Sequence, residues 1–111
     1  MVITARSVGN CRILNLNGRI VFGENTDALR RAVQEAVSQN YRKIVLNLSN
    51  VHCMDSLGVG ELIRSYNYTK DNGSKLVLTN LPVRIKYQLC IVKLDTVIED
   101  FETEEMALAS A

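Results

Sequence analysis

Apolar positions near the start of the chain fall in short extended runs. Val2–Ala5 and Cys11–Leu16 are rich in strand-forming residues, and the turn formers at positions 7–10 separate them. This pattern predicts a β-hairpin. Asn17-Gly18 should end the second strand, and Arg19–Phe22 could form a short third strand.

The spacing of apolar residues then changes to three and four. Between Thr26 and Gln39 the apolar positions that share one helical face are Leu29, Ala32, Val33, Ala36 and Val37. This spacing predicts an amphipathic helix. Lys43–Leu48 is almost continuously apolar, as expected of a central strand that is covered on both faces.

Two more helices alternate with strands in the second half. Val59, Leu62, Ile63 and Tyr66 indicate a second helix that ends near Asn72, where Gly73 can adopt a positive φ. The next predicted strand is Lys75–Thr79. Pro82 suits the first turn of a third helix that ends near Val92. The side chains expected to face the sheet from this helix are Val83, Tyr87, Leu89 and Cys90.

The chain closes with a predicted short strand at Val97 and Ile98 and a last helix that begins at Thr103. Glu104 and Glu105 would lie favourably against the dipole of that helix. The alternation indicates an α/β fold, with a mixed β-sheet of four to five strands and about four helices packed on it. Without a linker or repeat, residues 1–111 are expected to form one domain.

Composition narrows the class of partner. The 111 residues are 47% hydrophobic and 23% charged, which is ordinary for a globular domain, and the formal charge is only +1. We therefore expect no direct binding of nucleic acid. No export signal and no apolar run of about 18 residues is visible, which predicts a cytoplasmic protein without a membrane span.

The residues that often carry catalysis are sparse. Cys11, Cys53 and Cys90 fit no zinc or redox spacing, and His52 is the only histidine. Met54 stands where a nucleophile elbow of the Gly-x-Ser-x-Gly type needs its first glycine. We therefore expect no catalytic residues, no metal site, no cofactor and no enzyme.

The most informative stretch is the predicted junction between the central strand and the second helix, residues 50–62. Asp55 or Ser56 can cap this helix, and Gly58 and Gly60 lie in its first turns. The unpaired N–H groups of such a helix start stabilise an anion. A glycine costs about 1 kcal/mol relative to alanine in a helix, so these two indicate close approach, either within the chain or by another protein.

This stretch carries a family resemblance. Asp55–Leu62, Asp-Ser-Leu-Gly-Val-Gly-Glu-Leu, resembles the Asp-Ser-Ser-Gly-Leu-Gly signature of STAS-domain anti-sigma factor antagonists. The blocks Asn17–Ile20, Lys43–Leu48, Gly73–Leu78 and Leu94–Val97 resemble the family as well. The similarity therefore extends over essentially the whole chain and implies a single STAS domain.

The resemblance also implies a function. Such antagonists bind an anti-sigma factor that is a serine kinase, phosphorylation of a loop serine releases them, and a phosphatase restores them. By resemblance, Ser56 is the phosphorylation site and Asp55 orders the loop. The residues expected to bind the partner are Asp55, Ser56, Leu57, Gly58, Gly60 and Glu61. A monomer or weak dimer is expected.

Leu57 departs from the family pattern, which often has a second hydroxyl residue at this position. Leu57 is either an exposed apolar anchor for a partner or a residue tucked into the core. The departure keeps open a second function, namely a STAS subunit that does not switch, in a stress-sensing scaffold or a phospholipid-transport complex.

Overall fold

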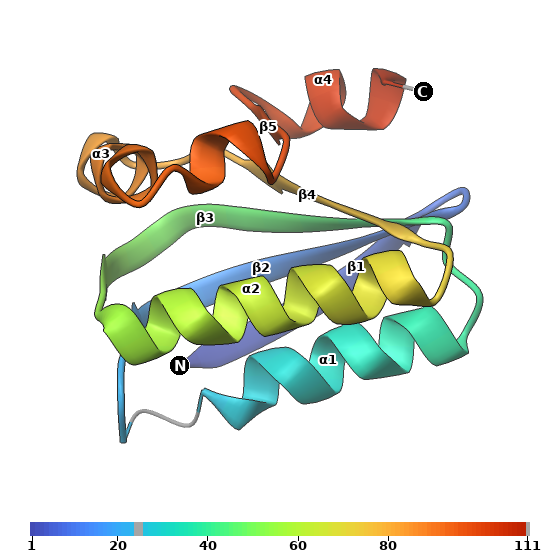
Figure 1. The fold of residues 1–111 in the computed structure, drawn as a ribbon. Coiled ribbons are helices and arrows are strands. Elements are labelled where there is room, and N and C mark those ends of the chain that lie inside the picture. The colour runs from blue at the N-terminus through green and yellow to red at the C-terminus, as the bar shows by residue number, and fades with distance from the viewer. Residues whose placement is uncertain (24–25, 111) are drawn as a thin grey trace.

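The computed structural model describes residues 1–23 and 26–110, which form a sheet covered by helices (Figure 1). The sheet has five strands in the order β1-β2-β3-β4-β5, and only the β1–β2 pair is antiparallel. The strands are β1 (Val2–Val8), β2 (Cys11–Ile20), β3 (Lys43–Met54), β4 (Lys75–Thr79) and β5 (Asp100–Phe101). The expected mixed α/β fold is confirmed.

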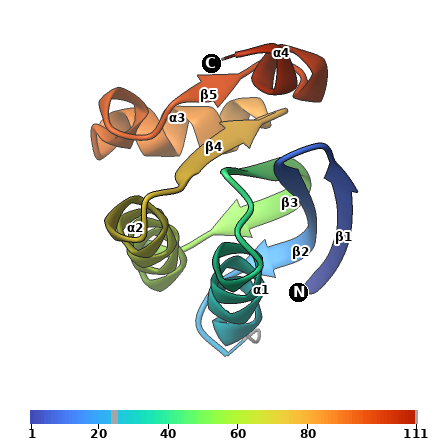
Figure 2. The same cartoon turned by 90° about the vertical axis from the view of Figure 1, so that its right-hand side faces the viewer.

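Four α-helices pack on this sheet. They are α1 (Asp27–Ser38), α2 (Ser56–Asp71), α3 (Val83–Ile91) and α4 (Glu104–Ala109), and a short 3₁₀ turn, η1 (Leu94–Thr96), precedes β5. Helices α1 and α2 lie side by side on one face (Figures 1 and 2). No helix among these residues is both long and apolar enough to cross a membrane.

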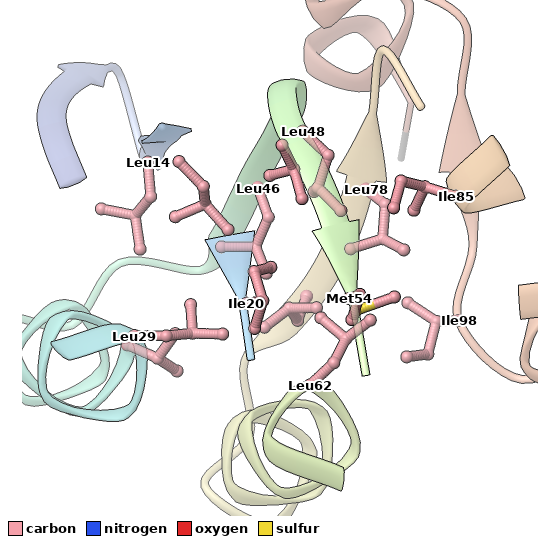
Figure 3. Close-up of a cluster of buried hydrophobic side chains, with 14 of the residues drawn as sticks. Leu14, Ile20, Leu29, Leu46, Leu48, Met54, Leu62, Leu78, Ile85 and Ile98 are labelled. Atoms are coloured by element: carbon pink, nitrogen blue, oxygen red, sulfur yellow. The ribbon is translucent and has the colours of Figure 1, made fainter. Parts of the chain in front are cut away.

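The larger core lies between the sheet and helices α1, α2 and α3. Leu14, Leu46 and Leu78 stand in register on neighbouring strands and point into this layer, where Leu62 of α2 and Ile85 of α3 meet them (Figure 3). The residues between these positions on each strand point to the opposite face of the sheet. Most of the buried apolar side chains lie on the face covered by α1, α2 and α3.

A smaller core lies on the opposite face, beneath α4. Ile13, Val45 and Val77 share one register line there, and Ala107 of α4 covers them. Lys43 also lies on this face, and its Nζ donates to the carbonyl oxygens of Ala107 and Ser110, both at 2.8 Å. Polar contacts at the C-terminal end thus hold α4 over a thin apolar layer.

Several sequence expectations are confirmed at the level of elements. The hairpin forms, α1 buries Leu29, Val33 and Ala36, and Gly73 adopts a φ of +82° after α2. The last helix begins as predicted, because the hydroxyl of Thr103 accepts a hydrogen bond from the N–H of Met106 at 3.2 Å.

The strand boundaries on either side of α1 were predicted wrongly. β2 runs through Asn17 and Gly18 to Ile20, with shifts in register at these residues, so Arg19–Phe22 forms no separate strand. β3 continues to Met54, because its second half pairs with the end of β2. The polar part of each strand is stabilised by pairing with the other strand, and local composition does not reveal this pairing.

The third helix and the following strand also differ from expectation. Val83, Tyr87 and Cys90 are exposed, and α3 faces the core with Ile85 and Leu89, which are four residues apart. Val97 and Ile98 form no strand, since η1 turns the chain before β5 begins at Asp100. Ile98 is buried as an anchor below this turn, whereas Val97 is exposed.

Candidate partner-binding site at the start of α2

Asp55 fixes the junction between β3 and α2. One of its carboxylate oxygens accepts a hydrogen bond from the N–H of Gly58 at 2.8 Å, which makes Asp55 the N-cap of α2. The other oxygen accepts from the N–H of Phe22 at 3.0 Å, and the N–H of Asp55 donates to the carbonyl oxygen of Ile20 at 3.3 Å. One side chain therefore joins the helix start to the chain that follows β2.

These hydrogen bonds also set the charge of Asp55. The N–H of Phe22 and then that of Gly58 favour the carboxylate and hold the pKa of Asp55 below its ordinary value. Asp55 is consequently ionised at neutral pH. Its carboxylate is already hydrogen-bonded to backbone N–H groups of its own chain.

The next two side chains face solvent. Ser56 is exposed at the first position of α2, and Leu57 is 52% exposed. The alternative in which Leu57 is tucked into the core is therefore excluded. A hydroxyl and an apolar side chain stand together in front of the helix start, where another protein can reach both.

Phe22 adds a second exposed apolar side chain that the sequence prediction missed as a site residue. It is 77% exposed, and its N–H is bound to Asp55. The exposed apolar side chains at this junction thus come from two segments, Leu57 on α2 and Phe22 after β2. An aromatic residue next to Gly23 in a polar loop was the available signal.

The two glycines of the motif have different surroundings. A Cβ on Gly58 would overlap the carbonyl oxygen of Ile20 and lie 2.8 Å from its carbonyl carbon. A Cβ on Gly60 would meet nothing closer than the Arg64 guanidinium, at 3.6 Å. Gly58 is therefore required by the approach of α2 to β2 within the chain, while Gly60 is not restricted in this way.

Glu61 lies inside the fold rather than on the surface. Its side chain is 2% exposed and is held between two arginines, with Arg30 Nε at 2.7 Å and Arg64 Nε at 3.1 Å from its carboxylate oxygens. Arg30 belongs to α1, so this cluster joins α1 to α2. Glu61 is therefore not itself part of the surface, and the exposed side chains of this cluster are the two arginines.

The structure brings Asp55, Ser56 and Leu57 together at one surface and places Gly58 and Glu61 beneath it. From the sequence we also expect the Gly23–Thr26 region to lie near the partner contact, and residues 24 and 25 of this region lie outside the described part of the chain. No group of three His, Cys, Asp or Glu side chains suited to a metal ion occurs among residues 1–23 and 26–110.

The sequence profile of the STAS domain matches residues 2–107. The chain belongs to the STAS domain family. Solved structures with the same fold include an anti-sigma factor antagonist candidate from Thermotoga maritima, which is 22% identical with a TM-score of 0.86; the match covers 96% of this STAS domain chain and 91% of that chain.

Two further solved structures with this fold belong to proteins named for different roles. The anti-sigma factor antagonist SpoIIAA from Bacillus, solved unphosphorylated and phosphorylated, is 18% identical in the unphosphorylated form, with a TM-score of 0.72 and coverage of 96% and 94%. A sulfate transporter family protein from Wolinella succinogenes is 20% identical, with a TM-score of 0.79 and coverage of 90% and 83%. At these identities the likeness establishes the STAS fold alone.

Proposed function

We propose that this STAS domain is an anti-sigma factor antagonist that works by partner switching in the cytoplasm. In this proposal the start of α2 binds an anti-sigma factor that is also a serine kinase. Phosphorylation of Ser56 releases the partner, and a phosphatase restores binding. The chain itself performs no catalysis.

The observation that carries the proposal is the exposed Ser56 next to the exposed Leu57 at the start of α2, with Phe22, also exposed, hydrogen-bonded through its N–H to Asp55 of the same junction. Leu57 and Phe22 supply exposed apolar contact area for a protein, and a kinase can reach the exposed hydroxyl of Ser56. Asp55 keeps this surface in one conformation through its two backbone contacts. A preordered surface loses less entropy on binding.

A phosphate on Ser56 should act on the interface more than on the fold. It adds about −1.5 to −2 charges at the positive end of the α2 dipole, which favours an anion. The same charge is costly when a partner removes it from water beside Leu57 and Phe22. A loss of about 2.7 kcal/mol lowers affinity about a hundredfold, so one phosphate suffices for release.

Incubation with a kinase-fold anti-sigma factor from the same organism and ATP tests this function. We expect intact mass to rise by one phosphate in the wild type and to stay unchanged in Ser56→Ala. Ser49→Ala is the matched control, because Ser49 is also exposed but lies on β3 away from the helix start. Equal labelling of Ser56→Ala and wild type would contradict the assignment of Ser56.

A second function rests on Leu57. In a STAS subunit that does not switch, within a stress-sensing scaffold or a phospholipid-transport complex, the 52% exposed Leu57 would act as a permanent apolar anchor. Leu57→Ser separates the two functions. It should abolish assembly of a permanent complex, whereas a switching antagonist should retain Ser56 phosphorylation and lose only part of its affinity.

A further inference from the structure

The two edges of the sheet differ in length and in charge. β5 contributes only Asp100–Phe101 at one edge and is flanked by Glu99 and Glu102, whereas β1 contributes Val2–Val8 at the other (Figure 2). Short length and charge discourage a foreign strand from pairing with an edge. β1 has neither protection, because it is long and Arg6 is its only charged residue.

The backbone of β1 has a defined outward pattern. Val8 and Cys11 pair across a two-residue turn in which Gly9 has a φ of +57°, so Val8 and every second residue before it bond to β2. Ile3, Ala5 and Ser7 therefore direct their N–H and C=O groups away from β2. Within the described part of the chain, no backbone hydrogen bond from another element reaches these groups.

We propose that this edge binds β1 of a second copy of the chain, in antiparallel pairing centred on Ala5. The facing pairs are then Val2 with Val8, Ile3 with Ser7, Thr4 with Arg6, and Ala5 with its own copy. The outward groups of Ile3, Ala5 and Ser7 fall opposite one another in this register. They form about six hydrogen bonds between the chains.

The side chains of β1 favour a second copy as the occupant. Val2 is 64% exposed and Val8 is 44% exposed, and both stand on the face of the sheet that carries α4. The proposed register places each Val2 opposite Val8 of the other copy, in the closer type of facing pair. The two exposed apolar ends of the strand thereby cover each other twice.

The register itself is restricted by Arg6 and by the strand ends. Moving the centre one residue toward the turn places Arg6 opposite Arg6, which repels. Moving it the other way leaves Val8 without a facing residue in the strand. With Ala5 at the centre, Arg6 faces Thr4 and keeps its ion pair to Glu104 of its own chain.

The resulting dimer has a two-fold axis perpendicular to a sheet that continues through both copies. The β2 strands then run in opposite directions, so the two Ser56 surfaces lie at opposite ends of the dimer and both stay open. Edge pairing covers little area, so association is weak and depends on concentration. The interface is separate from the proposed binding of a kinase partner.

Sedimentation equilibrium from micromolar to millimolar protein tests dimer formation. We expect the average mass to rise toward twice the chain mass of 12.4 kDa. Amide exchange measured by NMR over the same range should slow at Ile3, Ala5 and Ser7 and remain constant at Phe101 on the opposite edge. A constant mass, or slowing confined to another surface, would overturn the proposal.

Ala5→Lys and Asn67→Lys form a matched pair of variants. Both positions are exposed and both changes add one positive charge, but only Ala5→Lys places two like charges at the proposed axis. We expect dimerisation to weaken at least about tenfold in Ala5→Lys and to match wild type in Asn67→Lys. Equal dimerisation of the two variants would contradict β1 pairing.

Ala5→Pro gives an independent test if Ala5→Lys fails to fold. The N–H of Ala5 points away from β2, so proline removes a donor that only the second copy uses. Far-ultraviolet circular dichroism should confirm the fold, and dimerisation should again fall. A folded Ala5→Pro variant that dimerises like wild type would also refute the proposed pairing.

Discussion

The N-termini of α2 and α4 are capped in the same way but have different roles. Asp55 caps α2 through the N–H of Gly58, and Thr103 caps α4 through the N–H of Met106. Two carboxylates, Glu104 and Glu105, occupy the first turn of α4, whereas the first turn of α2 holds no acidic residue. The only carboxylate that the described residues place at the start of α2 is therefore the cap Asp55, and the exposed first turn carries none.

The partners of these side chains show the same contrast. Glu104 is bound within the chain, by Asn47 Nδ2 at 2.7 Å and by the guanidinium of Arg6, and helps hold α4 against the sheet. At α2, Ser56 and Leu57 project into solvent while the backbone beneath them is fixed. One helix start stabilises the fold, and the other presents a rigid surface.

The largest effect should come from filling the contact below α2. Gly58→Ala places a Cβ against the Ile20 carbonyl group, and we expect a loss of about 3 kcal/mol or more in the free energy of unfolding. Gly60→Ala is the matched control and should be neutral or stabilising by up to about 1 kcal/mol. Chemical denaturation measures both. Similar losses in the two variants would refute the distinction between these glycines.

A smaller effect should come from the charge at the start of α4. Glu104→Ala removes two hydrogen-bonded contacts and a favourable dipole interaction, and we expect a loss of about 1–2 kcal/mol. Glu105→Ala lies in the same turn but is exposed, and should cost no more than about 0.5 kcal/mol. Equal effects would show that the dipole alone, and not the docking of α4, is at work.

Asp55 should make stability depend on pH in the acid range. Its pKa is lowered in the folded state, so its contribution is present above the unfolded pKa of about 3.9 and is lost as pH falls through the folded value. Melting temperatures of wild type and Asp55→Asn should therefore converge on acidification below about pH 4. A difference that stays constant down to the lowest pH would contradict a charged cap.

The smallest effect on stability should come from Ser56 itself. Ser56→Asp adds a charge at an exposed position near the helix dipole, and we expect the free energy of unfolding to change by less than about 0.5 kcal/mol. Thermal and chemical denaturation check this. A loss above about 1 kcal/mol would make Ser56 part of the cap and remove the reason to regard it as a free acceptor.

Much of this arrangement was predictable from local sequence. Asp55 or Ser56 ahead of the glycine-containing turn indicated a helix cap, which the structure assigns to Asp55, and Thr103 followed by carboxylates indicated another. Both are confirmed because a cap depends on residues within four positions of each other. The family signature located the start of α2 because it, too, is a short run of neighbouring residues.

What was missed depends on contacts between distant segments. The role of Gly58 follows from the approach of the Ile20 carbonyl group, and the link of Phe22 to the start of α2 follows from the hydrogen bond between its N–H and Asp55. The extension of β3 to Met54 depends likewise on pairing with the end of β2. Sequence periodicity carries no information on such pairings, so the site could be located but its flank and its supports could not.

The most direct test of the account is the affinity of a kinase-fold anti-sigma factor from the same organism for three forms of the chain. Isothermal titration calorimetry should give similar affinities for wild type and Ser56→Ala, and an affinity about a hundredfold lower for Ser56→Asp or the phosphorylated chain. Binding that is unchanged by either negative charge would contradict the claim that the start of α2 is a phosphorylation-controlled interface.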